Sequence, residues 1–171
     1  MATGLPHLFV RGANPSATGY FIDGIRVPFL FHVAIGPSVI NPAVLGEIDF
    51  HPGAYPARYG RHTGGIVSAA RRDPSPTWRA EALIRLFDAG AYVEAPLLKG
   101  DLNVFVGARY SYTAPLLTLI APDTKLRYWD YQAGASYALS DRDRVGLFAF
   151  GSSDYLAKVA GDDTETELFG A

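Results

Sequence analysis

Four histidines are the residues in this 171-residue chain best suited to bind a metal ion or to transfer a proton. They are His7, His32, His51 and His62, and they lie 25, 19 and 11 positions apart. No two have the i, i+4 spacing that places both imidazoles on one helix face, and the sequence has no cysteine. This spacing is typical of ordinary loop histidines, so we predict neither a metal site nor thiol chemistry.

Sequence motifs for covalent catalysis and for phosphate binding are missing as well. No Gly-x-Ser-x-Gly sequence occurs, and the glycine-rich stretch from Gly12 to Gly19 lacks the lysine of a phosphate-binding loop. The acidic run from Asp162 to Glu167 offers oxygen ligands for calcium. It lacks the regular spacing and the glycine of a calcium loop, which favours a solvated acidic loop. We therefore predict a protein that is not an enzyme and that uses no cofactor.

Composition excludes further classes of function. The formal net charge is −2, from 15 Lys and Arg against 17 Asp and Glu, so no basic excess would attract nucleic acid. Plentiful Gly (18), Tyr (10) and Phe (10) favour strands and tight turns. No apolar run approaches the ~20 residues of a membrane-spanning helix. The first residues do not resemble a secretory signal, and we expect the sequence to be an excerpt of a longer one.

Residues 1–73 are interrupted throughout by Gly and Pro, which predicts a small sheet of short strands joined by long loops. We expect strands at 8–11, 19–25, 45–51 and 65–70. A short helical turn is expected from Asn41-Pro42, because Asn is a good N-cap and Pro suits the first helical position. Residues 74–77 are predicted to be a linker, since Pro74 and Pro76 interrupt any strand pairing.

The pattern changes after Trp78, where apolar and polar residues alternate. Between Leu102 and Tyr112, the even positions are apolar or aromatic and the odd positions are mostly polar or small. The stretches 127–139 and 78–87 repeat the pattern. Because side chains of a strand point to opposite faces in turn, each of these strands has one apolar face.

Alternation alone also fits a half-buried strand of a soluble protein, but three further features favour a lipid environment. The strands run ~10 residues or more, enough to cross a bilayer at a tilt. Aromatic residues lie towards the ends of the apolar faces, as at membrane interfaces. Short polar connections (98–101 and 140–143) alternate with long ones, as in outer-membrane barrels.

We predict five strands in this part of the chain, at 78–87, 90–97, 102–112, 126–139 and 144–155. A sheet of five strands cannot close into a bacterial barrel, because such barrels leave no unpaired edge in hydrocarbon. The predicted fold is therefore mainly β: a small mixed α/β plug sheet in residues 1–73, then antiparallel transmembrane strands of an incomplete barrel in residues 78–171. The remaining strands would come from further sequence or from other subunits.

Three short motifs in residues 1–73 support a family resemblance. They are Arg11-Gly12, then Tyr20-Phe21-Ile22-Asp23-Gly24, then the run from Tyr59 to Val67 that contains Gly64-Gly65. Their order and separation resemble the plug domain of TonB-dependent outer-membrane receptors. The chain as a whole is similar to the C-terminal part of such a plug followed by the first barrel strands.

The resemblance implies where a ligand would bind. Arg11 and Gly12 match the start of an apical plug loop that includes Asn14, and residues 27–35 match a second loop that approaches ligand in relatives. Phe29, Phe31 and His32 in this second loop would offer aromatic and polar surface to a bulky ligand. The alternative, which we favour, is that these aromatic residues pack the plug and that Arg11 forms structural hydrogen bonds.

The resemblance also implies a function and a set of partners. The chain would be a segment of a receptor in the bacterial outer membrane that takes up a scarce ligand, such as a siderophore, cobalamin, a saccharide or a peptide. Its partners would be outer-membrane lipid, the imported ligand and a TonB-type energy-coupling protein that binds an upstream segment. The apolar loop 115–122 would be one of the outer loops. The alternative function is that of a structural subunit in a multi-chain outer-membrane assembly that performs no transport.

Overall fold

The computed structural model of this protein describes residues 8–28, 30–34, 36–112, 121, 123–140, 142–159 and 165–170. The chain forms two compact units, residues 1–73 and residues 74–171. Both units are built on β-sheets, which confirms the fold class expected from the sequence.

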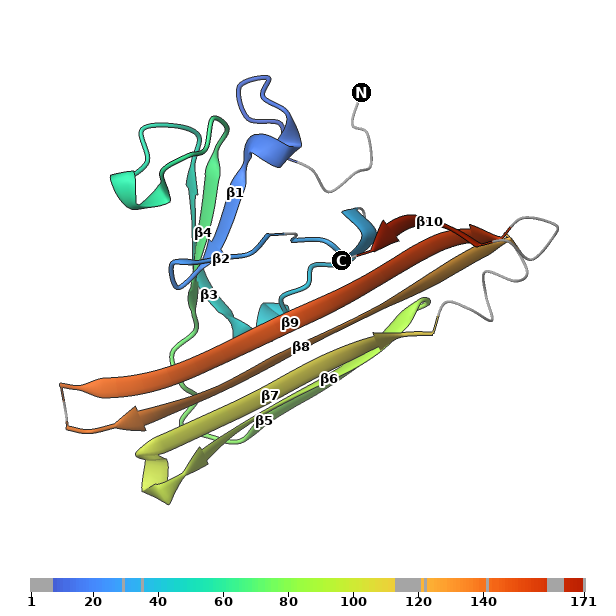
Figure 1. Ribbon diagram of the computed structural model, residues 1–171. Helices are drawn as coiled ribbons and strands as arrows, with labels where there is room; N and C mark the ends of the chain where they lie inside the picture. Colours follow the sequence, from blue (N-terminus) through green and yellow to red (C-terminus); the bar gives the residue numbers. More distant parts are fainter. Residues whose placement is uncertain are drawn as a thin grey trace. The chain divides into compact units, whose positions relative to one another are not determined.

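The first unit contains a four-stranded mixed sheet with the strand order β2-β1-β4-β3 (Figure 1). Strands β1 and β4 run parallel, and the other two neighbouring pairs run antiparallel. Short 3₁₀ helices lie in the connections. The elements are β1 (Gly19–Ile22), β2 (Ile25–Arg26), β3 (Leu45–His51), β4 (Ile66–Arg71), η1 (Pro15–Ala17), η2 (His32–Ala34), η3 (Pro42–Val44) and η4 (Ala57–Tyr59).

The predicted strand at 19–25 is instead a tight hairpin of β1 and β2. Asp23 and Gly24 form its turn with positive φ angles of 47° and 78°, a conformation that suits Gly and that Asp tolerates. The Asp23 carboxylate accepts a hydrogen bond from the Arg71 backbone N–H (2.9 Å) and pairs with the Arg71 guanidinium. The hairpin turn is thereby tied to the C-terminal end of β4.

Of the other predictions for this unit, two are confirmed and one is wrong. The strand at 45–51 is confirmed, and η3 confirms the helical turn, with the Asn41 side chain accepting a hydrogen bond from Ala43 N–H. The strand predicted at 8–11 does not form. Arg11 (φ 51°) and Gly12 (φ 76°) turn the chain, and Ala13 N–H donates to the Val10 carbonyl. Buried Ile22, Ile40 and Ile66 form the core.

The second unit is a single antiparallel sheet of six strands, which follow one another in sequence order from β5 to β10 (Figure 1). The longest are β8 and β9, which pair from Thr124↔Lys158 to Ala138↔Arg144. The strands are β5 (Arg79–Ile84), β6 (Asp88–Leu97), β7 (Leu102–Ser111), β8 (Thr124–Ala138), β9 (Arg144–Val159) and β10 (Glu165–Gly170), with η5 (Leu98–Gly100) between β6 and β7. Strand β10 was not predicted, and the sheet is not closed.

The strand pairing joins the alternating residues into two continuous faces. Val93 of β6, Val106 of β7 and Ala133 of β8 lie side by side, as do Gly107 and Gln132. The face that contains Trp129, Tyr131, Ala133, Ala135 and Tyr137 is called the apolar face below. The opposite face, with Tyr128, Asp130, Gln132, Gly134 and Ser136, is called the polar face.

Burial on this sheet is inverted relative to that of a water-soluble protein. Polar-face residues are almost fully buried: Asp130 is 2 % exposed, Gln132 0 % and Asp88 3 %. Large apolar residues on the opposite face are exposed, with Leu147 at 75 % and Val106 at 56 %. Exposed hydrocarbon on this scale is typical of a surface that lipid or another protein surface covers. The alternation seen in the sequence is thus confirmed as two faces of different solvation.

Candidate ligand-binding site

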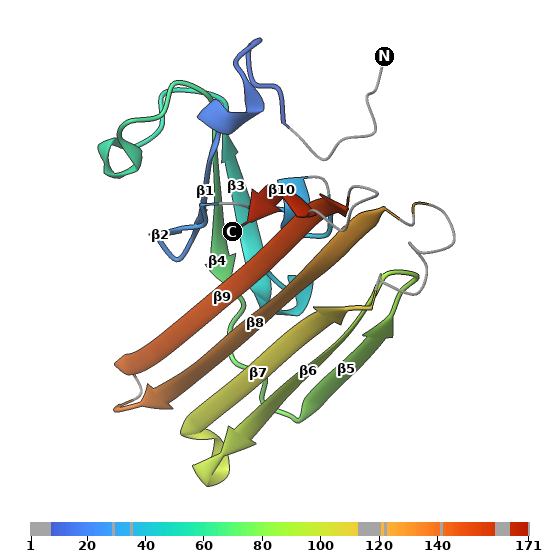
Figure 2. The same ribbon diagram turned by 45° about the vertical axis from the view of Figure 1, so that its right-hand side comes forward.

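Two loop segments meet at one end of the four-stranded sheet. Residues 8–18 lead into β1, and residues 52–65 connect β3 to β4. Because β1 and β4 are parallel and β3 is antiparallel to β4, both segments lie at the same sheet end (Figure 2). These two segments are called the apical loops.

Close backbone packing holds the apical loops together. Gly64 N–H donates to the Ala17 carbonyl (3.1 Å), and Gly19 N–H donates to the Gly65 carbonyl (2.9 Å). A Cβ atom on Gly64 would lie 2.8 Å from the Ala17 carbonyl carbon and oxygen, and one on Gly65 would lie 2.9 Å from Val10 Cγ2. The glycine pair noted in the sequence is therefore needed for the first apical loop to dock on the second.

Aromatic residues of the sheet and of the second apical loop pack against one another. The Phe21 ring of β1 lies 4.8 Å from the Tyr59 ring and 5.7 Å from the His62 ring. The Tyr59 hydroxyl shares a hydrogen bond of 2.7 Å with the Ser68 hydroxyl. This hydrogen bond and the neighbouring Arg58 lower the pKa of Tyr59. His62 also accepts a hydrogen bond through its carbonyl from the Tyr55 hydroxyl. The loops are thus positioned by packing on β1 and β4.

Two of the predicted ligand contacts, Arg11 and Asn14, lie in the first apical loop and are exposed. The Arg11 guanidinium covers Gly53 of the second loop: Nη1 would be 2.8 Å from a Cβ at that position. The Asn14 side chain caps η1 by accepting a hydrogen bond from Ser16 N–H (3.0 Å). Both residues therefore shape the loop in addition to being accessible on it.

The second predicted loop does not join the apical loops but packs beside β1. The Phe31 ring stands edge-on to the Tyr20 ring at 6.5 Å, and Phe31 pairs with Ser38 in an isolated bridge. The His32 side chain is fully buried. Phe29 lies outside the described residues, as do most of the loop 115–122 and the start of the acidic run at Asp162.

The polar face carries a hydrogen-bonded network that sequence reasoning did not identify residue by residue. Arg109 Nε donates to Asp130 Oδ2 (2.6 Å), and Gln132 Nε2 donates to Asp130 Oδ1 (2.9 Å). The Tyr128 hydroxyl donates to Asp88 Oδ2 (2.8 Å). Each residue stands on the polar parity of its strand, so alternation was the available signal. The pairing across strands depends on register, which the sequence does not show.

The segment that follows β4 is fixed to the same face. Ser75 N–H donates to Glu94 Oε1 (2.8 Å), and Asn103 Nδ2 donates to the Ser75 carbonyl (3.2 Å). Glu94 and Asn103 are each 3 % exposed. The Ser75–Glu94–Asn103 contacts are called the linker clamp below.

Among the described residues, no three His, Cys, Asp or Glu side chains lie close enough together to hold a metal ion. No helix within the same part of the chain has the length and hydropathy needed to cross a membrane.

In this chain a mixed sheet with apical loops is followed by an antiparallel sheet that has one exposed apolar face. Residues 2–67 match the family model described as TonB-dependent Receptor Plug Domain. The chain thus carries a TonB-dependent receptor plug domain joined to part of its barrel. Members of this family are receptors of the bacterial outer membrane and not enzymes.

Solved structures share this fold at low sequence identity. The siderophore receptor PirA from Acinetobacter baumannii matches with a TM-score of 0.59 and 16% identity, over 90% of this chain and 26% of that one. The pyoverdine outer membrane receptor FpvA from Pseudomonas aeruginosa PAO1, bound to pyoverdine, matches with a TM-score of 0.56 and 14% identity, over 81% of this chain and 21% of that one. The ferric enterobactin receptor PfeA from Pseudomonas aeruginosa, as the R480A_Q482A mutant, matches with a TM-score of 0.52 and 15% identity, over 90% of this chain and 27% of that one.

The chain therefore spans about a quarter of the length of the receptors it resembles. No curated protein sequence matches it.

Proposed function

We propose that this chain is the plug-and-first-strands segment of a receptor that imports a scarce, anionic ligand across the outer membrane. In this proposal residues 1–73 form the C-terminal part of the plug, 74–77 the linker and 78–171 the first barrel strands. A TonB-type protein, acting through an upstream segment, would supply the energy for uptake. The structures that match in fold are described as receptors for siderophores, which supports this class of ligand.

The charge of the apical loops is the observation that carries the choice of an anionic ligand. Arg11, Arg58 and Arg61 are exposed on these loops. Neither loop segment, 8–18 or 52–65, contains an aspartate or a glutamate. Guanidinium groups bind carboxylate, phosphate and catecholate-type oxygens through charge-assisted hydrogen bonds. Three exposed arginines on loops that contain no acidic residue therefore favour an anion.

The residues predicted from the sequence divide into two roles within this proposal. Arg11 contacts the ligand, and Asn14 sets the loop shape that presents Arg11. Phe31 and His32 stabilise the plug beside β1, since one packs on Tyr20 and the other is buried. Phe29 remains a predicted ligand contact.

Growth and binding measurements on the full-length receptor test the proposal. A deletion of its gene should abolish growth on one limiting nutrient, and the purified receptor should bind that nutrient. Replacing Arg58 and Arg61 together by Gln should weaken binding roughly 100-fold or more, because each hydrogen bond to a charged group contributes about 1.5–3 kcal/mol.

The matched control is Arg26→Gln, an exposed arginine on β2 outside the apical loops, which should leave affinity unchanged. A neutral or cationic ligand bound equally by all variants would refute the anionic assignment. A deletion strain without any growth defect, together with a stable partner that supplies further strands, would instead support a structural subunit.

A further inference from the structure

The two units are joined by the short stretch of chain between β4 and β5. In the first unit, Arg72 N–H donates a hydrogen bond to the Val44 carbonyl (2.9 Å). In the second unit, the linker clamp holds Ser75. Only Asp73 and Pro74 therefore lie between a residue anchored in one unit and a residue anchored in the other.

The linker clamp occupies both main-chain hydrogen-bonding groups of Ser75. Ser75 N–H donates to Glu94 Oε1 (2.8 Å), and Asn103 Nδ2 donates to the Ser75 carbonyl (3.2 Å). Pro74 and Pro76 have no backbone N–H and a fixed φ angle. Ser75 thus supplies the only main-chain donor of this tripeptide, and side chains of β6 and β7 take the place of strand pairing there.

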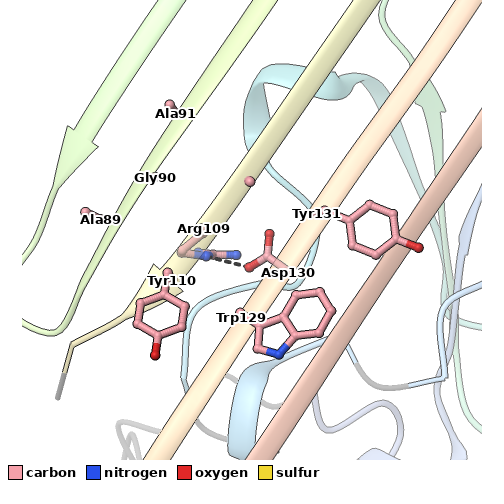
Figure 3. Close-up of a pocket in the computed structure, with 9 residues that line it drawn as sticks. Ala89, Gly90, Ala91, Arg109, Tyr110, Trp129, Asp130 and Tyr131 are labelled. Carbon is pink, nitrogen blue, oxygen red and sulfur yellow. Dashed lines mark hydrogen bonds and ion pairs between the residues drawn. The ribbon is translucent and has the colours of Figure 1, made fainter. Parts of the chain in front are cut away.

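The acceptor in the clamp, Glu94, is a buried carboxylate. The residue is 3 % exposed, and its other oxygen, Oε2, accepts a hydrogen bond from the Tyr92 hydroxyl (3.1 Å). Glu94 stands on the polar face, like the Arg109–Asp130 ion pair that joins β7 to β8 (Figure 3). Its Oε1 atom instead binds a backbone group outside the strands. Hydrogen bonds to a carboxylate are roughly twice as strong as those between neutral groups, so the clamp resists opening.

The length of free chain depends on whether the clamp is closed. A fully extended chain spans at most about 3.6 Å per residue, so Ser75 lies no more than about 11 Å from Arg72. If the clamp opens, the next residue fixed in the sheet is Arg79, where β5 begins to pair with β6, and the reach from Arg72 grows to about 25 Å. Opening of the clamp therefore adds about 14 Å of slack chain.

We propose that Glu94 and Asn103 are positioning residues for uptake. They fix Ser75, so that the C-terminal end of β4 stays in place when the energy-coupling protein pulls on the upstream part of the first unit. Strand β4 pairs with both β1 and β3, so its end is a suitable fixed point for that sheet. With the clamp open, the first movement of about 14 Å would extend slack chain instead of rearranging the apical loops. This inference rests on the proposed function of the chain in uptake.

A force measurement that needs no ligand tests the clamp itself. The full-length receptor is held in a dimyristoyl phosphatidylcholine bilayer and pulled through its N-terminal residue. Glu94→Gln combined with Asn103→Ala should add about 14 Å of extension at low force relative to the wild-type receptor. Glu81→Gln, which removes an exposed carboxylate of β5, is the matched control and should add none. No added extension in the double variant would overturn the proposal.

Binding and uptake measurements test the consequence for transport. The double variant should bind the nutrient identified with the deletion strain as tightly as the wild-type receptor does. Its maximal uptake rate should fall roughly ten-fold or more, the effect of one lost hydrogen bond to a charged group on the closed clamp. Inserting Gly-Ser-Gly-Ser after Asp73 keeps the clamp but adds about 14 Å of chain, so it should reproduce this loss. If Glu94 and Asn103 only stabilised the sheet, the insertion would not have this effect.

A heat-modifiability gel checks that each variant is folded. Normal uptake by the double variant or by the insertion variant would overturn the proposal. A deletion strain without a growth defect refutes uptake itself. Added extension in the double variant of that receptor would then show that the clamp anchors the linker without serving transport.

Discussion

At the scale of single residues, Gly64 shows how backbone contact rather than side-chain chemistry maintains the apical loops. An added Cβ would meet the backbone of Ala17, which cannot move without displacing η1. We expect Gly64→Ala to destabilise the plug by about 1–3 kcal/mol, the usual effect of overpacking. Hydrogen exchange of the full-length receptor measures this loss of stability, and exchange in β4 should be faster in the variant. Gly60→Ala is the matched control, since its Cβ would lie an ordinary 3.4 Å from the Ala57 carbonyl oxygen.

The ion pair of Arg109 and Asp130 is a second residue-scale case. Its side chains are 9 % and 2 % exposed, so Asp130→Asn would remove a carboxylate that pairs with a buried guanidinium. We expect a loss of about 3–5 kcal/mol in the free energy of unfolding. Denaturant titration of the full-length receptor in micelles measures it. Glu81→Gln removes the exposed partner of Arg79 (side chains 46 % and 38 % exposed) and should cost about 0–1 kcal/mol. Equal losses in the two variants would contradict the argument.

At the scale of elements, the linker clamp restrains the backbone of the segment that follows β4. Arg72 N–H donates to the Val44 carbonyl in the first unit, and Ser75 is held by Glu94 and Asn103 in the second. Only Asp73 and Pro74 lie between these two anchors. We expect Glu94→Gln combined with Asn103→Ala to speed exchange of the Ser75 amide about tenfold or more, since a charged hydrogen bond is lost. Unchanged exchange would show that the clamp does not restrain the linker, and Glu81→Gln is again the control.

Some of these elements could be predicted from the sequence and others could not. Period-two alternation identified β5, β7 and β8 and their faces, because lipid and polar surroundings select opposite residues at adjacent positions. It did not identify β10, whose first residues belong to an acidic run that was interpreted as a loop. The predicted strand at 8–11 fails because Arg11 has a positive φ angle, which residue type indicates only weakly outside glycine. Docking of Gly64 on Ala17 depends on tertiary contact and was not predictable.

At the scale of the whole molecule, the two sheet edges and the apolar face determine how residues 1–171 behave alone. Within the part of the chain that the structure describes, strands β5 and β10 each pair on one side only, and Val106, Leu147 and Tyr110 are more than half exposed. Unpaired edges and apolar surface both promote association in water. We expect the isolated chain to form large aggregates in buffer, as measured by light scattering. Detergent micelles should cover the apolar face but leave both edges unpaired, so small oligomers should persist there. A soluble monomer in plain buffer would mean that lipid does not face Val106 and Leu147, and the membrane orientation of the sheet would then be wrong.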